Sequence, residues 1–108
     1  MTEAHKEVPP ESFEKITEDA LALYSATLSD IDLHSTFLDA RYAWDVALKA
    51  RCIEKFGTTK ILQKVPAWQK LVGGTVEPEV DITPEQKAFV NREVSLFVRE
   101  FKESNNLN

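Results

Sequence analysis

The spacing of hydrophobic residues predicts a helix at each end of the chain. Between about residues 10 and 29 such residues recur at steps of three and four, which places them on one face of a helix: Phe13, Ile16, Ala20, Leu23, Tyr24 and Leu28. A second helix is predicted to begin at Thr83-Pro84-Glu85-Gln86, where a capping threonine precedes proline and a glutamine follows three positions after the cap. The same spacing then marks its core-facing seam as Val90, Val94, Phe97 and Phe101.

The longest predicted helix spans about residues 33–56, with Asp32 or Ser35 as its cap and Gly57 just past its end. It has one apolar face made of Phe37, Ala40, Trp44, Ala47 and Leu48. Nearly opposite lies a second apolar face made of Tyr42, Ala43, Val46, Ala50 and Ile53. A narrow polar strip separates the two faces and consists of Arg41, Asp45 and Lys49. Because a helix that is apolar on two faces must be covered on two sides, we predict that this helix is central, with Trp44 and Ile53 both covered. A face left open would instead indicate a surface for a partner.

The remaining segments complete an all-α prediction. Residues 58–72 are apolar at helical spacing, but Pro66 removes a backbone donor, so we expect two short helices over 59–64 and 66–72. Residues 1–9 are polar and charged, and we predict a mobile N-terminal tail there. Residues 10–108 are predicted to form a single helical domain, a compact bundle of four to five helices.

Composition agrees with an ordinary folded domain. Hydrophobic residues make up 43% of the chain and charged residues 29%, with a net charge of −5. No apolar run approaches the roughly 20 residues of a membrane-spanning helix, and the first residues lack the apolar stretch of a secretory signal. The lone cysteine excludes an internal disulfide framework. We therefore expect a cytoplasmic protein that has no membrane partner.

No motif in the sequence predicts an enzyme. The nucleophile elbow, the phosphate-binding glycine loop and the dinucleotide fingerprint are all missing from the sequence. Asp30, Asp32 and His34 alternate as metal ligands could, but a calcium loop would need glycine at position 35 and an acid at position 41. We predict helix capping there, with no metal and no cofactor.

Two weaker signals lie in the middle of the chain. Residues 46–76 are basic between acidic flanks, which offers an alternative function as a small nucleic-acid-associated regulator that uses the 49–70 region: Lys49, Arg51, Lys55, Lys60 and Lys64. The net negative charge of the chain weighs against this alternative, and so does Pro66, which lies within the helix that would have to recognise the nucleic acid.

The second signal is Cys52, which lies three residues from both Lys49 and Lys55. Cations at that spacing favour the thiolate, so we predict an accessible, mildly activated thiol.

The strongest functional signal is a second apolar stripe on the C-terminal helix. Phe89 and Leu96 lie seven residues apart, beside the predicted core seam, with Arg92 and Arg99 on one border. An apolar stripe edged by charges is typical of a partner surface. We therefore expect a non-enzymatic protein-protein interaction or adaptor module, whose partner is another protein or a second copy of itself.

Overall fold

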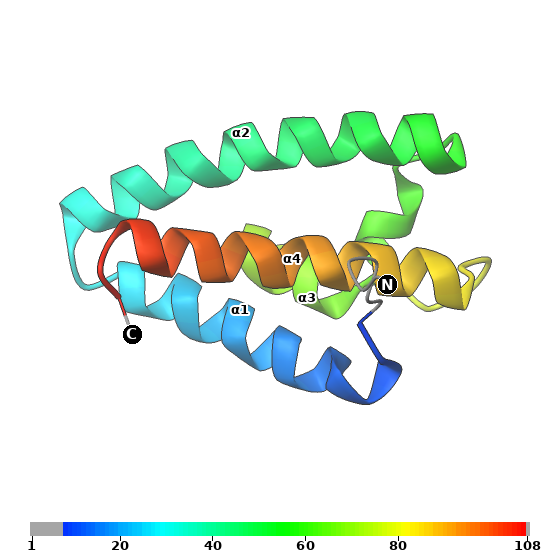
Figure 1. Cartoon of the computed structure of the whole chain (residues 1–108), viewed down its shortest axis with the longest axis horizontal. Coiled ribbons are helices and arrows are strands. Elements are labelled where there is room, and N and C mark those ends of the chain that lie inside the picture. Colours follow the sequence, from blue (N-terminus) through cyan, green and yellow to red (C-terminus); the bar gives the residue numbers. More distant parts are fainter. Residues whose placement is uncertain (1–7, 108) are drawn as a thin grey trace, which may run out of the picture.

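The computed structural model describes residues 8–107 and shows a bundle of four α-helices with two short 3-10 helices (Figure 1). In chain order the elements are η1 (Pro10–Ser12), α1 (Phe13–Thr27), α2 (Ile31–Phe56), η2 (Lys60–Lys64), α3 (Pro66–Val72) and α4 (Pro84–Ser104). The predicted all-α bundle is confirmed. The predicted N-terminal tail falls mostly outside the described residues, and Val8, at its end, packs against the core.

Local signals account for the helix ends. The side chain of Asp30 accepts hydrogen bonds from the backbone N–H groups of Asp32 and Leu33, so Asp30 caps α2, and the prediction of Asp32 or Ser35 as the cap is wrong. The helix stops at Gly57, whose φ of 77° lies in the left-handed region that glycine adopts without strain. At α4 the predicted capping box is present, since Thr83 and Gln86 exchange side-chain-to-backbone hydrogen bonds. The first helix ends earlier than predicted, and Leu28, just past its end, is 57% exposed.

Proline sets the break in the middle of the chain, as predicted. The residue before Pro66 is extended, which ends the 3-10 helix η2 and starts α3 with proline at its first position. Seven residues form α3, and four of them are buried. This short helix therefore serves mainly to fill the core.

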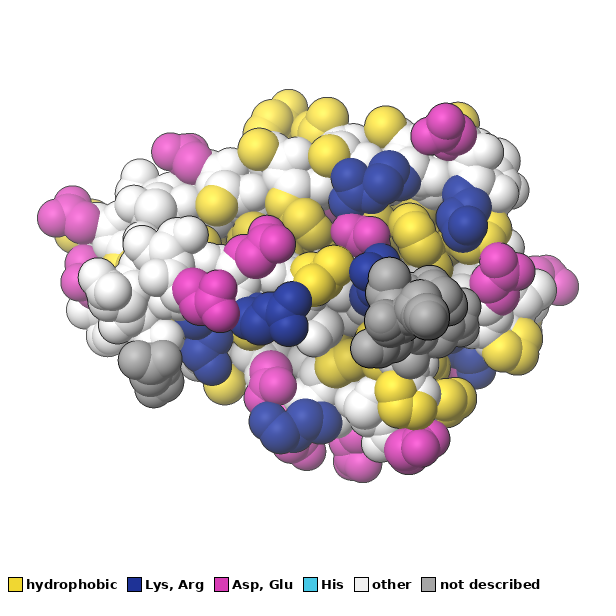
Figure 2. All heavy atoms as spheres, in the orientation of Figure 1, with side chains coloured by type: hydrophobic (Ala, Val, Ile, Leu, Met, Phe, Trp, Pro, Cys, Tyr) yellow, Lys and Arg dark blue, Asp and Glu magenta, His cyan; other side chains and the backbone are white. Residues whose placement is uncertain are grey.

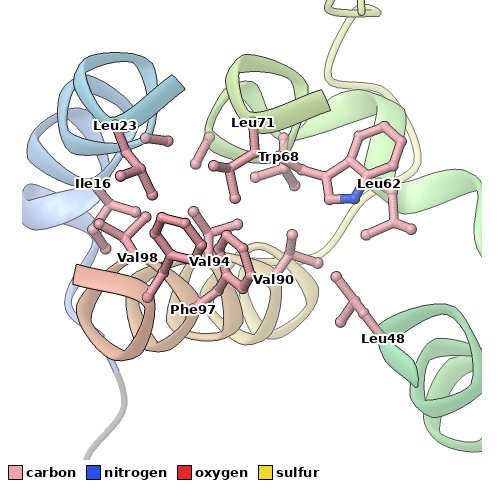
Figure 3. Close-up of a cluster of buried hydrophobic side chains, with 14 of the residues drawn as sticks. Ile16, Leu23, Leu48, Leu62, Trp68, Leu71, Val90, Val94, Phe97 and Val98 are labelled. Carbon is pink, nitrogen blue, oxygen red and sulfur yellow. The ribbon is translucent and has the colours of Figure 1, made fainter. Parts of the chain in front are cut away.

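Among the three long helices, α4 has the most buried residues, although its outer side is open to solvent at Arg92 and Arg99. It lies between α1 and α2, with α3 behind it, and contacts all three (Figure 1). Its predicted seam is buried throughout. Figure 3 shows the side chains of Val90, Val94 and Phe97 pointing from α4 towards α1 and α3, while Leu48 approaches from α2. The core thus forms mainly between α1, α3 and α4, and α2 closes one side of it.

The structure differs from the sequence prediction in the position of α2, which lies at an edge of the bundle. Its first apolar face packs inward, with Phe37 and Leu48 fully buried and Trp44 partly buried. Its second apolar face has no cover within residues 8–107, because Ile53 is 56% exposed. The expectation that Trp44 and Ile53 would both be covered is therefore wrong, because α1 and α3 pack against α4 and leave the outer side of α2 without a neighbouring helix.

Candidate functional site

The most prominent surface feature is the row of hydrophobic side chains along the outside of α2. Tyr42 is 73% exposed, Val46 53% and Ile53 56%, and we call these three residues the outer stripe. They are spaced by four and seven residues, which places them on one line along the helix. Exposed Ala43 and Ala50 border this line. Figure 2 shows hydrophobic side chains gathered along the edge of the molecule that α2 forms.

Polar contacts with α3 fix the rotation that turns the outer stripe away from the core. The guanidinium of Arg41 donates to the backbone carbonyl of Leu71 across 3.0 Å, and the indole N–H of Trp68 donates to Asp45 across 2.7 Å. Lys49 pairs with the other oxygen of Asp45 at 3.1 Å. The polar strip of α2 is thus tied to α3, and together with the inward packing of Phe37 and Leu48 this leaves the second apolar face pointing outward.

The predicted interaction residues on α4 occupy a different part of the molecule. Phe89 is partly buried, and its ring meets the ring of Phe56 edge-on with centroids 5.5 Å apart. Leu96 is also partly buried, while Arg92 and Arg99 are exposed. The structure thus places Phe89 in a contact between α2 and α4. The Phe89/Leu96 surface stays a prediction, but it offers a partner less apolar area than the outer stripe does.

Arg99 lines a groove of about 430 Å³ between α1 and the end of α4. Charged side chains form much of its lining, together with Ile16, Val98 and Leu107. A smaller cavity of about 260 Å³ is lined by Phe13, Val65 and Asn91, among others. Within residues 8–107, no three His, Cys, Asp or Glu side chains come together as metal ligands would.

The prediction of an accessible, activated Cys52 is wrong. Cys52 follows Leu48 by four residues, so both side chains face the core, and Cys52 is fully buried. Burial raises the pKa of its thiol to about 11, and the nearby charge of Arg51 offsets only part of that rise. Lys49 and Lys55 are exposed and do not activate the thiol, which is protonated at neutral pH.

Most cations of the predicted nucleic-acid surface are held by groups of the protein itself. Arg51 pairs with Glu93 at 2.7 Å, Lys49 pairs with Asp45, and the ammonium of Lys64 donates to the carbonyl of Val80. The ammonium of Lys55 lies over the rings of Phe56 and Phe89, and only Lys60 extends without such a contact among the described residues. The nucleic-acid alternative stays a prediction, and residues 8–107 present no continuous row of free cations that would favour it.

The sequence contained the signal for the outer stripe, because the second apolar face of α2 is visible in its periodicity. The sequence could not show on which side of α2 the neighbouring helices pack.

None of the α-helices within residues 8–107 is both long enough and apolar enough to cross a membrane. No protein-family model, curated protein or solved structure matches this chain.

Proposed function

We propose that this protein is a non-enzymatic protein-protein interaction module whose docking surface is the outer stripe of α2. The observation that carries the proposal is the exposure of Tyr42, Val46 and Ile53 in one line on a well-anchored helix. Burying apolar surface stabilises a complex by roughly 25 cal/mol per Å², so a partner that covers this line gains free energy. The contacts of α2 with α3 hold the helix in place, and this reduces the entropy that a partner's binding would cost.

The stripe is preferred to the Phe89/Leu96 surface for a physical reason. Phe89 already buries part of its ring against Phe56, so covering it again would gain less. The proposal includes a reducing compartment such as the cytoplasm, which suits a chain whose one cysteine, Cys52, is a buried free thiol.

Photo-crosslinking in cells of the source organism tests this proposal. The photoreactive amino acid p-benzoylphenylalanine replaces Tyr42, which is 73% exposed and tolerates a larger aromatic ring. We expect a covalent adduct of defined mass, with this protein or with another, when the cells are irradiated. Adding Val46→Glu should reduce its yield by roughly tenfold, equivalent to about 1.4 kcal/mol of lost binding free energy.

Leu21 provides the matched control, because it is a 46% exposed hydrophobic residue on α1, away from the stripe. Leu21→Glu should leave the yield of the adduct unchanged. If Val46→Glu and Leu21→Glu have equal effects, or if no adduct forms at position 42, the outer stripe is not the docking surface.

A further inference from the structure

The exposed face of α2 has the spacing of a helix-pairing seam that is longer than the outer stripe. Starting at Ser35, positions separated alternately by four and three residues fall on one line, as in helices that pair along their length. All six of these positions are exposed: Ser35, Asp39, Tyr42, Val46, Lys49 and Ile53. Because α2 has 26 residues, it is roughly 39 Å long and offers this line over most of its length.

The four central residues of this seam are complementary to themselves when the order is reversed, whereas the outermost pair sets Ser35 against Ile53. Reversing the order about the point midway between Tyr42 and Val46 puts each of these two residues in the place of the other. The same reversal exchanges Asp39 and Lys49. Two copies of α2 placed side by side in opposite directions therefore bring each Tyr42 against the partner's Val46 and each Asp39 against the partner's Lys49. A two-fold axis generates each of these contacts twice.

We infer that the outer stripe binds a second copy of this chain, with the two α2 helices antiparallel and Asp39 facing the partner's Lys49. This inference rests on the proposed function and names its partner. The parallel arrangement is disfavoured, because it would set Asp39 against the partner's Asp39 and Lys49 against the partner's Lys49.

Side chains at the seam are available for this contact. Asp39 is exposed and has no ion-pair partner among residues 8–107. The Lys49 side chain is 47% exposed, and its ammonium has three donors, so it can keep its 3.1 Å contact with Asp45 and also reach an acid on the partner. Ala43 and Ala50 border the stripe and let a second helix approach closely. Since only half of the six seam positions are apolar, the dimer is a weak one.

Charge reversal tests the pairing. By sedimentation velocity, the purified full-length chain should form a dimer with a dissociation constant between about 10 µM and 1 mM. Asp39→Lys alone and Lys49→Glu alone each place like charges opposite one another twice, and each should weaken the dimer by on the order of tenfold. A mixture of the two variants restores both opposite-charge pairs, so it should form heterodimers about as tightly as the unmodified chain pairs with itself.

Disulfide crosslinking tests the direction of the helices. Ser35→Cys and Ile53→Cys lie opposite each other in the antiparallel pair, so a mixture of these variants should form a mixed disulfide on mild oxidation. Ile53→Cys alone should not crosslink to itself, because the two copies of position 53 would be roughly 27 Å apart along the helices. The buried Cys52 makes the unmodified chain the control that stays uncrosslinked.

The outcomes separate this inference from the proposal it rests on. Self-crosslinking of Ile53→Cys, or a charge-variant mixture that associates no better than its components, overturns the antiparallel pairing. If the chain is monomeric up to about 1 mM while the crosslinker at position 42 captures a different protein, the second copy is excluded and the outer stripe remains a docking surface. If the chain is monomeric and no adduct forms, both are overturned.

Discussion

Trp68 of α3 donates its indole N–H to Asp45 of α2 across 2.7 Å, and this contact joins the shortest α-helix of the bundle to the longest. The Trp68 side chain is only 7% exposed, and the same carboxylate holds Lys49 through its other oxygen. This contact adds to the burial of Phe37 and Leu48, which sets the first apolar face of α2 against the core. The outer stripe lies on the other apolar face and stays exposed.

Removing the Asp45 carboxylate should destabilise the fold. Asp45→Ala leaves the indole N–H of Trp68 buried without an acceptor, which should lower the free energy of unfolding by about 1–3 kcal/mol in urea denaturation. Trp68→Phe removes the donor, and combining the two changes should reveal a coupling of about 0.5–3 kcal/mol. Additive effects of the two substitutions would mean that the hydrogen bond contributes nothing to stability.

Two neighbouring aromatic residues on α2 should differ sharply in their contribution to stability. Trp44 is partly buried, and its ring lies 4.9 Å from that of Phe97 between centroids, whereas Tyr42 is 73% exposed. Trp44→Ala should lower the free energy of unfolding by about 2–3 kcal/mol, somewhat less than for a fully buried tryptophan. Tyr42→Ala should change it by less than about 0.5 kcal/mol at micromolar protein concentration. Equal losses would show that Tyr42 is also part of the packed core.

The thiol of Cys52 should be unreactive until the protein unfolds. At pH 8 an alkylating reagent should modify it rapidly in urea and, in the native protein, only as fast as the structure opens. Rapid alkylation of the native protein would instead support the prediction from the sequence that Cys52 is accessible and activated.

The same burial makes stability depend on alkaline pH. The folded thiol has a pKa of about 11, above its usual value of 9.0, so between these pH values the unfolded chain loses the proton first. Ionisation then favours the unfolded state, and the free energy of unfolding should decline across this range by at most about 3 kcal/mol. The decline should be shallower in Cys52→Ala. Parallel curves for the two proteins would rule out a contribution from the thiol.

Replacing Phe89 and Leu96 distinguishes a surface from a structural contact. Because Phe89 packs on Phe56, Phe89→Ser should lower the melting temperature, and Leu96→Ser should lower it less. Association, measured by sedimentation, should change little in the double variant as long as it remains folded. Lost association with an unchanged melting temperature would instead identify this stripe of α4 as the partner surface.

The capping box of α4 offers a local test of the fold. Thr83→Ala removes the acceptor for the backbone N–H of Gln86 and should lower the free energy of unfolding by about 1 kcal/mol. Thr75→Ala, in the exposed loop before α4, serves as the control and should have no measurable effect. If both substitutions have the same effect, the cap does not contribute to stability.

Local features of the fold could be predicted from the sequence because their causes lie within a few residues. The capping box at Thr83, the stop at Gly57 and the break at Pro66 each depend on the chemistry of one or two side chains and their own backbone. The α4 seam was equally predictable, since a single apolar stripe on a helix has only one way to be buried.

What the sequence alone determined about α2 was that it has two apolar faces separated by a polar strip. Which face would be covered depended on contacts between residues that lie far apart in the chain. These include the packing of Phe37 on Phe97 and Phe101 and the hydrogen bond of Trp68 to Asp45. The burial of Cys52 depended on the same packing, because Cys52 lies one helical turn after Leu48 and faces the core with it. Periodicity fixes the angles between side chains on one helix, whereas only the packing of other helices against it decides which of those angles face the core and which face a partner.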